Sequence, residues 1–528
     1  MVTQQEQGPV AVYAEYGRER VGWFFGLTGW QLVTLAAAGL PVFWAIRAQV
    51  WTSAGLLALV WLAVAALTVV PVRGRSAVGW LVACGAYAVG ALTGWSRFRA
   101  RAAAGRAGDL DAVDLPGVLA GVQIHDGPPW GPTSSRVAII QDHATRRWAV
   151  TASLVHPGIG LAGGQERRRF GSGLSELLEV ACRGGLVEEV QFIVRTVPDD
   201  GAERDVYVQR HRRPGGPGLA RLVNDALREG LTRAAVRTEA FVTVVVREAR
   251  LAREARECGG GLEGRARVLY SLMGEVEAQL RGGLGMTAVT WLTSPQLALA
   301  CRTAFAPGDR AVVVDAAAAL ARQGRATADP TLNGQPVNAV PVSVNAEVPW
   351  ALAGPSGAQA TVRAYAHDAW HSVSSTIKLP DRGAVLGALA PVLVPAQAGE
   401  RRSLVVVYPI VAPGRAQRQS GTRQWGADLG EALRDKAKVR RTTAAGDEAA
   451  RARGTEAKLA RGAALTHPYA VATITTPRAV PAAEAGRRLD SSIRTAGFAP
   501  LRLDLAQDAA FAASTVPLGI TLTGRGDR

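Results

Sequence analysis

Three stretches without a charged residue follow one another near the amino terminus, and they constrain the chain more than any other feature. They cover residues 21–46, 48–72 and 76–96. A helix needs about 20 apolar residues to cross a hydrocarbon core of about 30 Å, and a charge at the bilayer centre is costly. The sequence therefore predicts a chain that is attached to a membrane at one end and carries a large water-soluble body.

Residues 26–46 and 50–70 each have the length of a membrane span, and only a few residues around Arg47 separate them. This spacing leaves no room for a folded domain, so it predicts a transmembrane helical hairpin. Buried core helices are the alternative, but apolar core helices are generally shorter. A cleavable secretory signal is not expected, because the first apolar run is too long and a second one follows at once.

Arginines flank the predicted hairpin on both sides, with Arg18 and Arg20 before it and Arg73 and Arg75 after it. The positive-inside rule places both clusters in the cytoplasm. The abundance of Arg, Ala and Gly indicates a GC-rich bacterial genome. We therefore expect a multi-pass protein of the bacterial cytoplasmic membrane whose body faces the cytoplasm.

The third apolar run, 76–96, contains several glycines and is followed by more arginines. If it crossed the membrane, the basic body would face outward. The sequence therefore favours a helix at or near the inner membrane surface, although a third span stays open. The arginines expected to contact anionic lipid are Arg73, Arg75, Arg97, Arg99 and Arg101.

The composition narrows the choice of partners. The chain has 528 residues, 60 basic and 44 acidic side chains and a net charge of +16, which favours acidic lipid or polyanions. No dense basic stripe with interleaved aromatic residues is present, so direct nucleic-acid binding is not expected. The four cysteines lie far apart without a C-x-x-C pair, which predicts reduced thiols in a cytosolic body.

Beyond the connector 101–115, apolar periodicity and turn residues predict alternating strands and helices. The expected strands or extended segments are 136–141, 148–155, 187–197, 241–246, 286–292, 360–379, 403–411, 469–475 and 501–505. The expected helices are 165–182, 219–231, 264–280, 295–304, 382–393 and 482–495. The alternation with hairpins predicts the α+β class, with mixed or antiparallel sheets.

Composition shifts suggest five units along the chain. They are a cytoplasmic tail at 1–25, the hairpin at 26–72, a juxtamembrane helix and linker at 73–114, and two cytoplasmic α+β domains at 115–335 and 336–528. Residues 415–465 are dense in Ala, Arg, Glu and Lys but poor in large apolar side chains. This segment is predicted to protrude from the second domain as a solvated helix or helical hairpin, with disorder as the alternative.

Two motifs raise the possibility of chemistry, and both are weak. Gly158 to Gly163 matches the dinucleotide fingerprint G-x-G-x-x-G, but the preceding strand belongs to a predicted hairpin and no acidic residue follows at the usual distance. His367 and His371 resemble H-E-x-x-H with Asp368 in place of Glu. Their surroundings predict a strand, in which residues four apart lie about 13 Å apart and cannot share a zinc ion.

The chain also lacks a phosphate-binding G-x-x-x-x-G-K-[ST] loop and a G-x-S-x-G elbow. We therefore expect no catalytic residues, no metal ligands and no cofactor, and a protein that is not an enzyme.

Six short segments carry a resemblance to a known family. In chain order they are Pro71-Val72-Arg73-Gly74-Arg75, 151–163, Gln165-Glu166, Phe170-Gly171, 191–198 and 508–519. Together they resemble an actinobacterial membrane protein family encoded beside PrgI-like membrane proteins and ATPases of type IV (conjugative) secretion systems. That family in turn resembles the non-ATPase amino-terminal part of TraC/TrbE-type conjugation ATPases, fused to a two-span membrane subunit.

The resemblance implies a non-catalytic inner-membrane subunit that docks a separate secretion ATPase and neighbouring PrgI-like subunits. In the larger ATPases a Pro-Leu-Gly turn like Pro517-Leu518-Gly519 precedes the nucleotide-binding core, so the resemblance implies that another polypeptide hydrolyses ATP. Two alternatives stay open. One is an EccE-like membrane subunit of a type VII secretion system, and the other is a nucleotide- or metal-dependent membrane enzyme.

Overall fold

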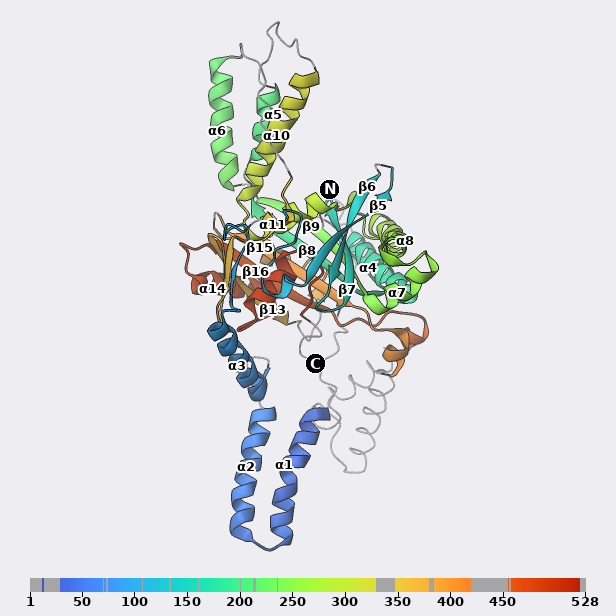
Figure 1. Cartoon of the computed structure of the whole chain (residues 1–528), viewed down its shortest axis with the longest axis vertical. Helices are drawn as coiled ribbons and strands as arrows, with labels where there is room; N and C mark the ends of the chain where they lie inside the picture. Colours follow the sequence, from blue (N-terminus) through green and yellow to red (C-terminus); the bar gives the residue numbers. More distant parts are fainter. Residues whose placement is uncertain are drawn as a thin grey trace, which may run out of the picture.

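The structure is a computed structural model of an elongated molecule with three parts along its long axis (Figure 1). Apolar helices lie at one end, a body built on a large β-sheet lies in the middle, and a group of helices projects from the other end. The structure describes residues 12–13, 29–69, 71–72, 75–106, 108–132, 134–158, 162–199, 201–211, 215–234, 236–328, 347–378, 384–397, 399–418, 454 and 457–522.

Three apolar helices form the amino-terminal end: α1 (Gly29–Arg47), α2 (Trp51–Val69) and α3 (Ala77–Thr93). α1 and α2 lie side by side, since Gln31 Nε2 donates to Thr68 O at 2.7 Å and Trp61 Nε1 donates to Leu35 O at 2.9 Å. α3 lies between this pair and the body (Figure 1). The three helices lie within the three charge-free runs, and neither Pro41 in α1 nor the glycines of α3 interrupt them.

The body is organised by one sheet of 13 strands, with the main order β4-β11-β12-β13-β16-β15-β8-β9-β7-β6-β5, while β10 pairs with β7 and β17 with β13. Every pairing among the described strands is antiparallel. The strands of this sheet are β4 (Arg97–Arg99), β5 (Val122–Trp130), β6 (Ser135–Asp142), β7 (Arg147–Val155), β8 (Val187–Pro198), β9 (Val236–Arg247), β10 (Ala288–Trp291), β11 (Gly357–Ala360), β12 (Tyr365–His367), β13 (Trp370–Lys378), β15 (Arg401–Pro409), β16 (Tyr469–Pro477) and β17 (Ala499–Arg502). This confirms the α+β class with an antiparallel sheet.

Helices cover both faces of the sheet. The helices of the body are α4 (Gly164–Gly184), α7 (Glu248–Glu257), α8 (Gly261–Gly282), α9 (Ser294–Phe305), α11 (Trp350–Ala353), α14 (Ala482–Thr495) and α15 (Gln507–Thr515), with the short turns η1 (Gly117–Leu119) and η2 (Ala390–Leu393). α4, α7, α8 and α14 pack on one face over Val, Leu and Ile side chains. α9, α11 and α15 cover the other face.

The sheet is continuous across the proposed boundary between residues 335 and 336. β15 from the second stretch pairs with β8 from the first, with Val406 opposite Phe192 and Val405 opposite Ile193. The two proposed domains therefore share one sheet.

Two further sheets have only two strands each. They pair β1 (Val12–Tyr13) with β14 (Ala384–Val385) and β2 (Pro71–Val72) with β3 (Arg75–Ser76).

A projection formed by α5 (Ala202–His211), α6 (Gly218–Ala234) and α10 (Asp309–Ala328) lies at the end of the molecule opposite α1 and α2 (Figure 1). α5 contacts α10, and the Arg204 guanidinium donates to Asn224 O on α6 at 3.3 Å. The predicted protrusion at 415–465 lies largely outside the described residues.

The predicted helix at 382–393 is wrong for its described part. Strand β14 covers two of these residues, and only the 3-10 turn η2 forms at the end of the segment. Gly387 has a φ of +89° and Pro391 lacks a backbone donor, and both features oppose a continuous α-helix. The extended segment predicted at 360–379 is divided among β11, β12 and β13, which are antiparallel neighbours joined by turns. The other predicted strands and helices that lie among the described residues form within a few residues of their expected bounds.

Candidate functional site

The most extensive apolar surface belongs to α1, α2 and α3. Phe43, Trp44 and Leu59 have exposed side chains, and the exposed fractions range from 69 to 78%. Among the described helices, α2 alone is long and apolar enough to cross a membrane by length and composition, with a mean hydropathy of 2.1. One such helix near the amino terminus is therefore established, and a multi-pass arrangement stays a proposal.

The exposed face of α3 is also apolar. Leu81, Val82, Val89 and Leu92 are exposed, while Tyr87 on the opposite side points to the body, with its hydroxyl 3.5 Å from Ala360 O. Because α3 continues from α2 toward the body in Figure 1, its apolar face extends the surface of the helix pair. This surface is what the charge-free runs predict for residues that meet lipid or another protein.

The arginines expected at the membrane surface lie at the junction between α3 and the body. Arg97 and Arg99 belong to β4, which pairs with β11 at the edge of the large sheet. Arg101 follows and forms an ion pair with Asp114 at 3.4 Å, with its own side chain 59% exposed. Arg75 lies in β3, and Arg73 lies outside the described residues. The structure therefore places Arg97, Arg99 and Arg101 next to one another, and strand β4 holds the first two at the edge of the large sheet.

A second apolar surface lies on the projection. Leu219, Leu222, Val223 and Leu227 of α6 have exposed fractions between 46 and 74%. Their spacing of three, four and eight residues places them on one face of the helix. An amphipathic helix normally buries this face against its own protein, and here the face is open. The sequence predicted the helix and its periodicity, but not that its apolar side would be exposed.

The glycine motif does not form a dinucleotide site in the described part of the chain. β7, which precedes it, pairs in antiparallel fashion with β6, β9 and β10, whereas a dinucleotide site needs parallel strands joined by a crossover. The Gly158 N–H donates to His156 Nδ1 at 2.9 Å. Helix α4 begins at Gly164, and residues 159–161 lie outside the described residues.

The sequence predicted one strand through the histidine motif, and the structure has a β-hairpin there instead, with a turn between the two histidines. His367 ends β12 and His371 lies in β13, and His371 is opposite Ala366 in the register. His367 lies 2.8 Å from Phe305 O and 2.8 Å from Ser372 Oγ, so both ring nitrogens have partners. Burial lowers the pKa of His367 to about 3, with Arg401 adding to the shift, so the ring is neutral at pH 7. It is a structural hydrogen-bonding residue of the core.

The structure reveals a buried polar layer that sequence reasoning missed. Arg195 on β8 forms an ion pair with Glu239 at 2.7 Å and donates to Ala300 O and Thr515 O at 2.9 and 3.2 Å. Arg401 on β15 is 1% exposed and donates to Thr303 O at 2.7 Å. Burial, together with the nearby Arg195 charge, lowers the pKa of Arg401 to about 9.

Helix α15 closes this polar layer. Thr515 Oγ1 lies 2.9 Å from Ser403 Oγ, and Ser514 Oγ lies 2.6 Å from Thr473 Oγ1. Thr151 Oγ1 donates to Pro517 O at 2.9 Å just after the helix. Residues of α15 and the turn after it therefore fill this layer, and their hydrogen bonds stabilise the fold.

The described residues provide little for acid–base or nucleophilic chemistry. They contain no group of three or more His, Cys, Asp or Glu side chains arranged to hold a metal ion. Burial raises the pKa of Cys301 to about 12, so this thiol is protonated at neutral pH and is a poor nucleophile. The two exposed apolar surfaces are the stronger candidates for function.

No known protein family matches the chain, and a search of curated proteins found no match.

Proposed function

We propose that this protein is a membrane-anchored, non-catalytic subunit of a type IV-like secretion or conjugation apparatus. In this proposal α1 and α2 form a hairpin in the bacterial cytoplasmic membrane, and the body faces the cytoplasm. The projection docks a separate ATPase, and α3 with its adjacent arginines lies toward anionic lipid and neighbouring PrgI-like subunits.

The observation that carries the proposal is the placement of the two apolar surfaces at opposite ends of one molecule (Figure 1). Helices α1 and α2 expose large apolar side chains on the sides that do not pack against each other, as lipid-facing helices do. α6 exposes an apolar stripe far from them along the long axis. A subunit that connects a membrane to a cytoplasmic partner needs both surfaces, and a rigid sheet between them holds their separation.

The lipid-facing role of the junction is supported by charge. Arg97 and Arg99 lie on an edge strand immediately after α3, and Arg101 is more than half exposed. Each arginine near an anionic membrane surface contributes about 1 kcal/mol to binding. The junction is thereby suited to hold the body against the cytoplasmic leaflet once the hairpin is inserted.

Affinity purification of the full chain from detergent-solubilised membranes tests the partner assignment. We expect co-purification of a secretion-type ATPase, and we expect Leu222→Asp on α6 to reduce its recovery because a charge replaces an apolar contact. Asn224→Asp adds the same charge on another side of α6 and serves as the matched control. Recovery of no ATPase under mild conditions, or equal recovery with Leu222→Asp, would contradict the proposal.

A further inference from the structure

The end of the large sheet that lies away from the projection carries a second group of basic residues. β8 leads into α5 and β9 follows α6, so the start of β8 and the end of β9 lie away from the projection. β15 ends at the same place, where Pro409 is opposite Glu189 of β8. In Figure 1 the orange segment that precedes β16 lies at the lower edge of the body, on the side of α1 and α2.

Two segments between β15 and β16 extend from this end of the sheet. Residues 410–418 follow β15, and residues 457–468 precede β16. The Val411 N–H donates to Leu465 O at 3.0 Å, which joins the two segments to each other. Ala416 is 2% exposed, so the turn that carries the charged residues is packed onto the body.

The two segments carry basic residues and no acidic ones. Their basic residues are Arg415, Arg418, Lys458 and Arg461, and all four are exposed. Neither 410–418 nor 457–468 contains an Asp or a Glu, so four cations and no acid give the segments a net charge of +4. Like charges gathered on one surface produce a positive potential that attracts anions.

The neighbouring turn between β6 and β7 adds to this charge. Arg146 is exposed there, and the side chain of Arg247 at the end of β9 is 50% exposed. The nearby acids are Glu188 and Glu189, whose side chains are only 14 and 2% exposed, and Arg147 forms ion pairs with both. The arginines at this turn therefore reach solvent while the acids lie beneath them.

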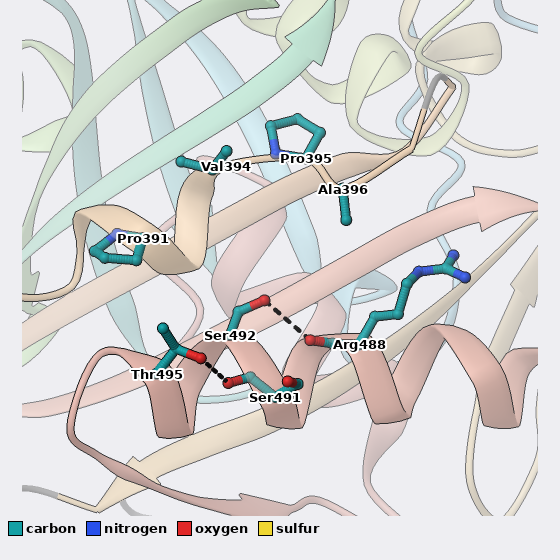
Figure 2. A pocket seen from close by; sticks show the side chains of 8 residues that line it. All are labelled: Pro391, Val394, Pro395, Ala396, Arg488, Ser491, Ser492 and Thr495. Atoms are coloured by element: carbon teal, nitrogen blue, oxygen red, sulfur yellow. Dashed lines mark hydrogen bonds between the residues drawn. The ribbon is translucent and has the colours of Figure 1, made fainter.

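The side of the body around α14 shows the contrasting arrangement. Arg488 lines a groove between α14 and the segment after η2, and in Figure 2 its side chain points away from Ser491. Arg488 donates to Glu400 at 3.1 Å and to Glu484 at 2.6 Å. Its charge is thus balanced within the protein, and the groove offers no excess positive charge to an anion.

We infer that the end of the sheet facing α1 and α2 binds the phosphate groups of anionic lipids through a basic surface. This basic surface consists of Arg146, Arg247, Arg415, Arg418, Lys458 and Arg461. The inference rests on the proposed insertion of α1 and α2, which brings the same end of the body toward a membrane. Guanidinium groups bind phosphate with paired hydrogen bonds, and an anionic leaflet attracts basic side chains within about 10 Å.

The composition of the two segments favours lipid over nucleic acid. Proteins that bind single strands combine basic residues with aromatic side chains on which the bases stack. Residues 410–418 and 457–468 contain no Phe, Tyr or Trp. A lipid phosphate needs only the cations.

This contact gives the body a defined orientation. In Figure 1 α3 and the orange segment lie on opposite sides of the lower end of the body. A single attachment through α3 leaves the body free to tilt, whereas a second contact on the other side resists tilting. The projection is then held at a fixed distance from the membrane, where it meets its partner.

Hydrogen–deuterium exchange of the full chain in nanodiscs tests the basic surface. One set of nanodiscs contains only phosphatidylcholine, and the other also contains phosphatidylglycerol. With phosphatidylglycerol, peptides covering 412–418 and 457–463 should exchange at least about fivefold more slowly, which is the effect of one basic residue at an anionic surface. Peptides of α6 should exchange equally in both sets, and about 1 M salt should remove the difference because it screens the charges.

The same data separate this inference from the proposed anchor. Slow exchange of α2 in both sets of nanodiscs supports the anchor. If α2 is protected but the basic surface exchanges equally in both sets, the lipid contact alone is refuted. If α2 exchanges freely, the anchor and the inference that rests on it both fail. Protection of the two segments by a single-stranded oligonucleotide, without protection by phosphatidylglycerol, would assign the surface to nucleic acid and overturn the inference.

Charge-neutralising variants locate the effect. Replacing Arg415, Arg418, Lys458 and Arg461 together with Gln should abolish the difference between the two sets of nanodiscs. The matched control replaces four exposed arginines outside the basic surface with Gln, namely Arg168, Arg169, Arg210 and Arg221, and should retain the difference. Both variants have the same net charge, so only the position of the cations differs. Protection that persists in the first variant, or is lost in the control, would refute the assignment.

Discussion

A single arginine at the centre of α2 tests whether this helix lies in lipid. Leu59 lies beside the midpoint of Trp51–Val69, and its side chain is 69% exposed. α2 contains eight leucine and valine residues, and each contributes about −0.3 to −0.6 kcal/mol to insertion near the bilayer centre. Their total is about −2.4 to −4.8 kcal/mol, and a central arginine costs about 2.5 to 3.5 kcal/mol. Leu59→Arg therefore removes most of the insertion free energy of α2.

Because α1 packs on α2 and is itself apolar, the decisive variant carries an arginine in each helix. Leu40 lies in the second half of α1 and is 68% exposed. We expect Leu59→Arg to lower the amount of protein that floats with carbonate-washed membranes in a density gradient. The double variant Leu40→Arg/Leu59→Arg should abolish flotation.

The matched control is Trp51→Arg, which places the same charge at the end of α2. A long arginine side chain there reaches the headgroup region, so the expected loss is small. Flotation of the double variant at the level of the unmodified chain would show that neither helix is held by lipid, and the proposed anchor would be refuted.

Three further predictions concern the stability of the body, measured by thermal or chemical unfolding of the full chain. Glu239→Gln should lower the unfolding free energy by about 3–5 kcal/mol, because it leaves the buried charge of Arg195 without its acid. The pKa of His367 is about 3 in the folded protein against 6.5 in the unfolded chain. The unfolded state therefore binds more protons between these values, stability falls as pH falls below about 6.5, and His367→Gln should reduce this slope. Gly173→Ala should cost about 1–3 kcal/mol, because its Cβ would lie 2.2 Å from the backbone that follows α8. Gly184→Ala, at the open end of α4, should be nearly neutral. A destabilising Gly184→Ala with a silent Gly173→Ala would contradict this account of the α4–α8 contact.

Local patterns in the chain were sufficient to predict most of its elements. The hairpin of β6 and β7 follows from two apolar runs around Asp142 and Arg146, and α4 follows from the spacing of Leu174, Leu177 and Leu178. The strand at His371 followed from its β-branched and aromatic neighbours. Each of these signals lies within one element, where nearest-neighbour sterics and alternation of burial decide the conformation.

Other elements were missed because their local signals are weak. α15 is rich in alanine, and its stability depends on the sheet beneath it rather than on an amphipathic pattern. α5 has a predominantly polar sequence and packs against α10 in the projection. The segment 382–393 was predicted to be an α-helix, but a glycine in the left-handed region and a proline limited its helical part to a 3-10 turn.

The charge-free runs alone establish that the amino-terminal helices are apolar on all sides. The polarity of a side chain is given by its residue type, and tertiary packing does not change it. Contacts between residues distant along the chain depended on the tertiary structure. Folding joined β8 to β15 in one sheet, paired Glu400 with Arg488 beside a groove, and left the apolar stripe of α6 exposed. Each of these features depends on which surfaces pack together in the folded protein. That choice is decided by the net free energy of folding, which is a sum of interactions over the whole chain.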